Sequence, residues 1–213
     1  MKNFLKIFLF CISVTICLFL IKVTHMLLTS RAVVVKLLPA SDKEEKDIFE
    51  LFSDSYKTDL LVSGEFKDIQ SATRSAKEGT DLRKKNPSEH RVYVIQDMKT
   101  NNKVGYLWWF PRSCLPNQVD SYKKFAHLGF VYILEKYRRS GFMKAAILLT
   151  EKESRDLGYV AMSLSVFQFN NPAKALYESL GYKVNDKKCN ERKCEMIKEL
   201  VDDDYRVVGA ATY

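Results

Sequence analysis

The most apolar run of the chain lies near its N-terminus, where residues 7–21 carry no charged side chain. As a helix this run spans about 22 Å, which is short of the ~30 Å hydrocarbon core of a bilayer. Residues 4–28 are long enough if Lys6 and Lys22 reach the two interfaces. Because no small-residue cleavage site follows closely, the pattern favours an uncleaved single-pass anchor over a cleaved signal peptide. In a third interpretation, translation starts at Met26 and the run is not made.

Residues 30–213 alternate between β-rich runs and amphipathic segments, which is typical of an α/β (α+β) domain. Runs rich in β-branched and aromatic residues, bounded by turn residues, predict the strands. Two of these runs flank a short KTNN turn and predict a hairpin. The predicted strands are 33–40, 91–98, 103–110, 124–134, 160–167, 182–186 and 194–200.

Helix signals follow the first, fourth and fifth of these runs. Ser41 and an acidic first turn predict a helix directly after the first strand. A second predicted helix starts after Gly141 and stops at Gly158, a residue suited to the left-handed conformation that ends helices. The third covers residues 171–181, with Pro172 in its first turn. This order predicts a mainly antiparallel sheet with two late crossover helices. Residues 62–90 are polar, with predicted helical stretches broken at Gly64, Gly79 and Pro87.

The net charge of +8 is unevenly placed along the chain. The three lysines of the first 29 residues supply +3 and leave +5 for the remainder. This surplus is too small to indicate nucleic-acid binding, and no basic stripe with interleaved aromatic residues occurs. A surplus of this size suits an anionic cofactor.

The five cysteines show no spacing typical of zinc sites, so no metal site is predicted. Cys189 and Cys194 lie in the polar turn of a predicted hairpin and are close enough in sequence to pair across it. Free thiols in a reducing compartment are nevertheless the favoured interpretation.

The stretch YRRSGFMKAA, residues 137–146, places two arginines, a serine and a glycine before strong helix formers. Gly141 suits the mouth of a helix, where a missing side chain lets a ligand approach the backbone. Unpaired backbone N–H groups and the helix dipole favour a phosphate there, and Arg138 and Arg139 add positive charge. Taken alone, the pattern also fits a solvated basic turn.

Two longer segments, VYILEKYRRSGFMKAAILL and LSVFQFNNPAKALYESLGY, together with the order of elements, resemble the GNAT superfamily of acyl-CoA-dependent N-acetyltransferases. The phosphate pattern of that family, Gln/Arg-x-x-Gly-x-Gly/Ala, matches residues 138–143, with Met143 replacing the second small residue. The resemblance implies a GNAT-like mixed, mainly antiparallel central sheet flanked by helices, with acetyl-CoA as co-substrate. It also implies that the strand before the loop diverges from its neighbour and pairs with the pantetheine amides. The implied cofactor-binding residues are Val131, Tyr132, Ile133, Arg138, Arg139, Ser140, Gly141, Phe142, Met143, Lys144, Asn170 and Ala173.

The resemblance also implies catalytic roles. Tyr177 is the implied general acid for the CoA thiolate, and a half-buried core tyrosine is the alternative. Asn170 is either a pantetheine ligand or an ordinary helix N-cap. For the proton acceptor, His127 lies on the strand where some family members keep a glutamate, and Glu135 is the other nearby candidate. A chain of water molecules would serve equally well.

The sequence therefore predicts an enzyme that moves an acetyl group from acetyl-CoA to a primary amine by direct attack in a ternary complex. The acceptor, a small molecule or a protein, is expected against residues 55–90 and 111–123. The alternative function is a membrane-tethered acyl-CoA sensor without turnover. No nucleic-acid partner is predicted.

The predicted domains are an anchor or signal segment over residues 1–29 and an acetyltransferase domain over residues 30–213. Contact with the membrane is expected through residues 4–28. Because acetyl-CoA is expected in the cytoplasm, we expect the domain of a single-pass membrane protein to face that side. A cleaved signal would instead give a secreted protein, and a start at Met26 a cytoplasmic one.

Overall fold

The computed structural model describes residues 33–85, 90–112 and 125–200. The elements below belong to the unit Val35–Tyr213. The predicted anchor, residues 4–28, lies outside the described residues. Among the residues that are described, no helix is both long enough and apolar enough to cross a bilayer.

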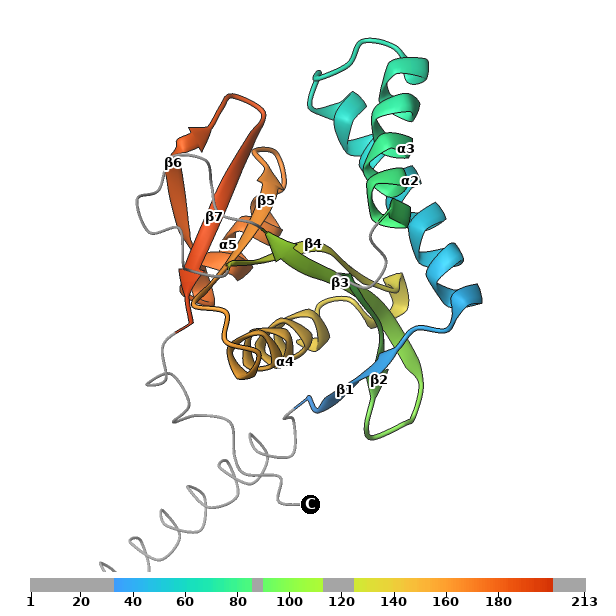
Figure 1. Cartoon of the computed structure of the whole chain (residues 1–213), viewed down its shortest axis with the longest axis vertical. Coiled ribbons are helices and arrows are strands. Elements are labelled where there is room, and N and C mark those ends of the chain that lie inside the picture. Colours follow the sequence, from blue (N-terminus) through green and yellow to red (C-terminus); the bar gives the residue numbers. More distant parts are fainter. Residues whose placement is uncertain (1–32, 86–89, 113–124, 201–213) are drawn as a thin grey trace, which may run out of the picture. The chain divides into compact units, whose positions relative to one another are not determined.

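A mixed, mainly antiparallel sheet forms the centre of the described region (Figure 1). Its strand order is β1-β2-β3-β4-β5-β7-β6, and every neighbouring pair is antiparallel except β4 and β5. The predicted α/β architecture is therefore confirmed. The strands are β1 (Val35–Pro39), β2 (Arg91–Asp97), β3 (Lys103–Arg112), β4 (Phe125–Ile133), β5 (Ala161–Phe167), β6 (Lys183–Cys189) and β7 (Lys193–Glu199).

Four α-helices flank the sheet in the described part of the chain: α2 (Asp42–Val62), α3 (Ile69–Lys85), α4 (Phe142–Asp156) and α5 (Asn171–Ser179). Helix α2 begins with a capping box, in which the Ser41 side chain accepts from the Glu44 N–H and the Glu44 carboxylate accepts from the Ser41 N–H. The predicted break at Gly64 is confirmed, since Gly64 takes a positive φ of 70° after α2.

The predicted break at Gly79 is wrong, because α3 runs through it as one helix. A glycine inside a helix costs only about 1 kcal/mol relative to alanine, and packing readily outweighs that cost. Ala72 and Ala76 of α3 are fully buried, and Ala72 packs in a cluster with Leu60 of α2. Tertiary packing therefore holds together a segment that looks interrupted in the sequence.

Helices α2 and α4 pack on opposite faces of the sheet (Figure 1). Trp108 of β3 meets Phe52 of α2 edge-on, with ring centroids 5.2 Å apart. The next residue, Trp109, is fully buried and donates its indole N–H to the Glu153 carboxylate of α4 at 3.2 Å. The Tyr93 hydroxyl of β2 donates to the same carboxylate. Because buried donors need acceptors, Glu153 fixes α4 against β2 and β3.

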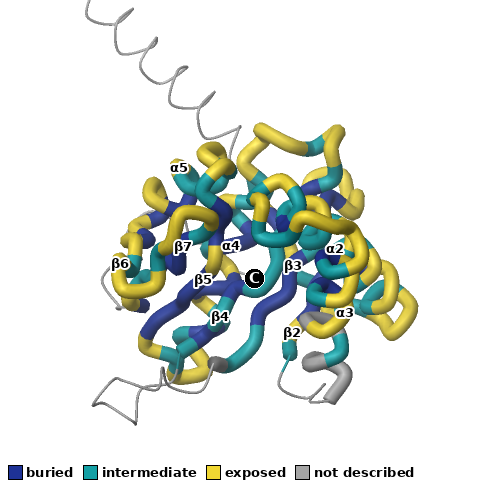
Figure 2. The backbone as a smooth tube through the Cα atoms, turned by 90° about the horizontal axis from the view of Figure 1, so that it is seen from above, coloured by how far each residue is buried: buried dark blue, intermediate teal, exposed yellow. Residues whose placement is uncertain are grey.

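Burial follows this layering. Figure 2 shows the buried backbone concentrated in the central strands, with exposed residues along the outer surface of α3. The largest fully buried side chains include Ile147 of α4, Met162 and Leu164 of β5, and Met196 of β7. Burying side chains of this size stabilises the fold by about 1.5–3 kcal/mol each.

The parallel pairing of β4 with β5 is short. It runs from Phe125 opposite Ala161 to Leu128 opposite Leu164 and then stops. Strand β4 continues to Ile133 along β3, and β5 continues along β7. The two central strands therefore diverge beyond Leu128, as the resemblance implied.

The C-terminal hairpin differs from expectation in its length and in its cysteines. Strand β6 continues to Cys189 rather than ending near residue 186, which brings Cys189 opposite Cys194 of β7. Their Cα atoms lie 4.1 Å apart, and the structure joins the two side chains in a disulfide. The sequence favoured free thiols over this pairing across the hairpin, and it is the longer strand that brings the two cysteines face to face.

Candidate active site

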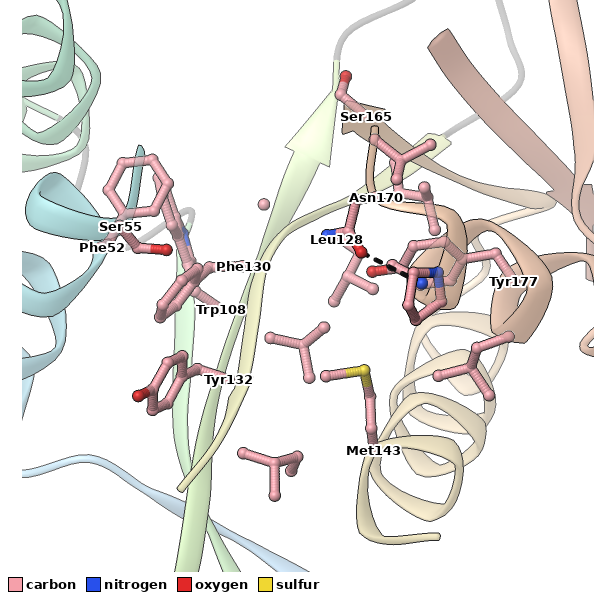
Figure 3. A pocket seen from close by; sticks show the side chains of 18 of the residues that line it. Phe52, Ser55, Trp108, Leu128, Phe130, Tyr132, Met143, Ser165, Asn170 and Tyr177 are labelled. Atoms are coloured by element: carbon pink, nitrogen blue, oxygen red, sulfur yellow. Dashed lines mark hydrogen bonds between the residues drawn. The ribbon is translucent and has the colours of Figure 1, made fainter. Parts of the chain in front are cut away.

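A cavity of about 1130 Å³ lies where β4 and β5 diverge. Its walls come from α2, β3, β4, the loop before α4, β5 and α5. Figure 3 shows the rings of Phe52, Trp108, Phe130 and Tyr132 on one side, with Asn170 and Tyr177 across from them. A concave, largely apolar site with a few polar groups is the usual form of a substrate pocket.

The diverging end of β4 contributes backbone as well as side chains. Val131, Tyr132 and Ile133, for which contact with the pantetheine arm is predicted, all line the cavity. Their pairing partners lie on β3, and the ladder with β5 has already ended at Leu128. The edge of β4 that faces β5 is therefore available to the amide groups of a bound ligand.

The loop before α4 is built to receive an anion. Gly141 is the N-cap of α4 with φ 88° and ψ −4°, and no side chain caps the first turn. Gly141, Phe142, Met143 and Lys144 line the cavity, so the first turn of the helix opens toward it. Unpaired N–H groups and the positive end of the helix dipole meet there, which is the usual arrangement for binding phosphate.

Two arginines shape this loop in different ways. The Arg138 guanidinium donates to the Ile133 carbonyl at 3.1 Å and to the Tyr132 hydroxyl at 3.2 Å, which ties the loop to the end of β4. Arg139 adopts a left-handed φ of 64°, an uncommon conformation for a bulky residue that is typical of functional turns. Both line the cavity, whereas Ser140 does not and its hydroxyl donates to the Arg138 carbonyl at 3.4 Å.

Met143, which departs from the family pattern, does not turn away from the ligand space. Its side chain lines the cavity and extends between β4 and α5 (Figure 3). The helix-mouth geometry is set by Gly141, so a larger residue at position 143 changes the shape of the cavity rather than the cradle of N–H groups.

Helix α5 supplies the opposite wall with Asn170, Ala173 and Tyr177. The Asn170 side-chain oxygen accepts from the Ala173 N–H at 3.3 Å, so Asn170 is the N-cap of α5 while it also lines the cavity. Tyr177 is only 8% exposed, and burial raises the pKa of its phenol to about 12. The phenol therefore stays protonated at neutral pH, as a proton donor must.

The two candidate bases have different surroundings. His127 lines the cavity and sits one rung before the end of the β4–β5 ladder, opposite Ser163. Its Nδ1 lies 2.9 Å from the Ser163 hydroxyl oxygen. Glu135 is the exposed first residue of the 3-10 helix η2 (Glu135–Tyr137), outside the cavity lining. Because Glu135 is exposed and outside the lining, the geometry favours His127 over Glu135 as the base.

Part of the cavity falls in the region expected for the acceptor, and part of it was not predicted from sequence. Ser55, Tyr56, Asp59 and His90 lie within residues 55–90, whereas the lining residues Phe52, Ser165 and Lys193 were not singled out. Trp108 and Phe110 also line it, while Trp109 belongs to the core. One signal for the α2 residues was present in the sequence, since the face that carries Phe52 also carries polar residues. Of the expected acceptor region 111–123, residues 113–123 lie outside the described residues. The lining residues that α2 supplies are Phe52, Ser55, Tyr56 and Asp59.

Known proteins share this fold and parts of this sequence. The model of the acetyltransferase (GNAT) family matches residues 46–182, more than half of the chain. The uncharacterized N-acetyltransferase YycN of Bacillus subtilis (strain 168) is 26% identical over 160 residues, covering 71% of this chain and 94% of that protein. The crystal structure of YycN has a TM-score of 0.61 at 24% identity, covering 72% of this chain and 94% of its own.

A more distant structure has the same fold. PaiA N-acetyltransferase from Thermoplasma acidophilum, solved in complex with coenzyme A, has a TM-score of 0.53 at 17% identity, covering 78% of this chain and 98% of that one. The matched residues 46–182 include the helix mouth at Gly141, the diverging strands and Tyr177. The chain therefore belongs to the acetyltransferase (GNAT) family and is an N-acetyltransferase with acetyl-CoA as its co-substrate.

Proposed function

We propose that this enzyme transfers the acetyl group directly to a primary amine while both substrates are bound. The observation that carries this proposal is the continuity of the cavity. It reaches from the helix mouth at Gly141, past the divergence of β4 and β5, to the face of α2. A single space with an anion-binding end and a separate aromatic end has room for both molecules together.

The residues at the centre of the cavity suit the proton transfers of this reaction. The amine nitrogen forms a bond to the acetyl carbon, the carbon–sulfur bond breaks, and the amine gives up one proton. Tyr177, protonated because burial raises its pKa, donates to the departing sulfur. His127 takes the proton of the amine, so atoms and charges balance.

Ser163 supports the assignment of His127. The Ser163 hydroxyl donates to the Ala126 carbonyl at 3.4 Å, so the same oxygen can accept from His127 Nδ1–H at 2.9 Å. A hydroxyl has one hydrogen, and this arrangement satisfies both contacts at once. It leaves Nε2 as the unprotonated nitrogen, which is the form that a base requires.

The direct test uses the purified full chain in a mild detergent. Acetyl-CoA is supplied with a panel of primary amines, release of free CoA is followed with a thiol reagent, and acetylated products are identified by mass. We expect amine-dependent release of CoA. Calorimetric binding of acetyl-CoA without turnover of any amine would instead support a sensor that binds acyl-CoA.

Replacing His127 with glutamine tests the base. We expect kcat to fall by about 10²-fold, because glutamine can bond to Ser163 but cannot take a proton. The affinity for acetyl-CoA, measured by calorimetry, should stay unchanged. Ser163→Ala is the companion variant and should give a smaller loss. It removes the hydroxyl that contacts the His127 imidazole but leaves the imidazole in place. A kcat within twofold of the parent in His127→Gln would assign proton removal to water.

A further inference from the structure

Helix α2 presents an unusual face to the cavity. Phe52, Ser55, Tyr56 and Asp59 all line it, at the spacing i, i+3, i+4 and i+7 that places residues on one side of a helix. This side would ordinarily carry only apolar residues toward the core. Here it offers two aromatic rings, a hydroxyl and a carboxylate to the ligand space.

The rings on this face continue an aromatic wall across the cavity (Figure 3). The Phe52 ring lies 5.2 Å from Trp108, 5.4 Å from Phe130 and 5.5 Å from Tyr56, centroid to centroid. Tyr56 in turn lies 6.1 Å from Phe167 of β5. Aromatic faces attract both alkyl chains and cations, so this wall suits an organic cation with an apolar body.

Asp59 is the one acidic residue among the described residues that line the cavity. Within the part of the chain that the structure describes, no donor or cation pairs with its carboxylate. Lys193, also in the lining, lies 3.9 Å from Glu65 instead. Burial alone raises the pKa of Asp59, as expected for a carboxylate that is partly removed from water without compensation.

The two ends of the cavity therefore carry opposite charge. Arg138, Arg139 and Lys144 lie at the helix mouth, where the phosphates of the co-substrate are expected. Asp59 lies on a different element, α2. The Tyr56 ring of that helix packs with Phe52 and Phe167 of the aromatic wall. A carboxylate at this end repels phosphates and attracts cations, which assigns α2 to the acceptor.

The charge on Asp59 also indicates which nitrogen it meets. An attacking amine must be neutral, because an ammonium nitrogen has no lone pair for the thioester. In the proposed function that nitrogen gives its proton to His127 of β4, whereas Asp59 lines the cavity from a different element, α2. The group at Asp59 is therefore a cation other than the nitrogen that is acetylated.

We propose that the acceptor is an amine with a second positive charge on an apolar linker, and that Asp59 and the aromatic wall bind that second charge. This inference rests on the proposed function, since it identifies the acceptor of the same cavity. Diaminobutane and diaminopentane are the probes, and butylamine and pentylamine are the matched monoamines of equal length.

Two measurements test the inference with the full chain. In the first, kcat/KM of the parent should be about tenfold or more higher for each diamine than for its monoamine, mainly through KM. Asp59→Asn should remove this preference and leave the monoamines within about twofold. In the second, calorimetry with enzyme saturated with CoA should detect diamine binding that Asp59→Asn weakens by about tenfold.

A matched control lies on the same helix. Asp54 is exposed, pairs with Lys57 at 2.8 Å and does not line the cavity, so Asp54→Asn should change neither measurement. Melting temperatures of both variants check that the fold is kept. Equal kcat/KM for diamines and monoamines, or equal losses for both in Asp59→Asn, would overturn the inference. Diamine binding that depends on Asp59 but gives no acetylation would preserve it and contradict the proposed function instead.

Discussion

Tyr177→Phe should lower kcat by about 10²-fold or more while the affinity for acetyl-CoA stays within about twofold. The substitution removes one hydroxyl from a ring that lines the cavity and keeps the packing of that ring against Tyr182, at 5.9 Å between centroids. Loss of a proton donor slows the departure of the thiolate, whereas binding relies on the loop before α4 and on β4. Steady-state kinetics and calorimetry separate the two effects.

The raised pKa of Tyr177 bears on the role proposed for it. A pKa of about 12 keeps the phenol protonated, which suits the role proposed for it as donor to the sulfur as charge develops there. Its ionisation should therefore not lower kcat between pH 8 and pH 10. Tyr182→Phe, which changes a buried tyrosine outside the cavity lining, is the control and should leave kcat unchanged. Equal losses in both variants would point to packing rather than proton donation.

Gly141→Asp should weaken acetyl-CoA binding by about 10²-fold or more. At φ 88° any side chain is strained, and the new carboxylate would stand at the mouth of α4, where the phosphates are expected to bind. Strain and charge repulsion act together, but only the second is specific to the ligand. Calorimetric titration of acetyl-CoA into the full chain measures the change.

The other end of the same helix provides the control for strain. Gly158 follows α4 with φ 82°, has open space around the position of a side chain, and does not line the cavity. Gly158→Asp should therefore reduce thermal stability by an amount similar to Gly141→Asp, on the order of 1 kcal/mol. Its acetyl-CoA affinity should match the parent. A comparable loss of affinity in the two variants would show that helix stability, rather than the helix mouth, limits binding.

The parts of the site that could be predicted from sequence are local in the chain. The glycine at the helix mouth, the Asn170 cap and Tyr177 one helical turn after Ala173 lie within short segments whose residue types dictate backbone geometry. Strands and helices with clear boundaries were predicted for the same reason. Met143 was recognised as a departure by comparison with the family pattern.

The remaining features depend on contacts between distant segments. Trp108 and Trp109 are neighbours in sequence, and only the packing of β3 decides that one faces the cavity and the other α4. Glu135 is close to the site in sequence but turns outward in η2. The place of Asp59 depends on how α2 crosses the sheet, which no local pattern specifies.

The short ladder between β4 and β5 has a consequence for how the sheet holds together. Four rungs, from Phe125–Ala161 to Leu128–Leu164, join the strands β1 to β4 to the strands β5 to β7. A ligand in the gap that bonds to the free edge of β4 takes the place of the missing backbone pairs. In the proposed complex the co-substrate fills this place, and we therefore expect the stability of the folded sheet to rise with co-substrate concentration.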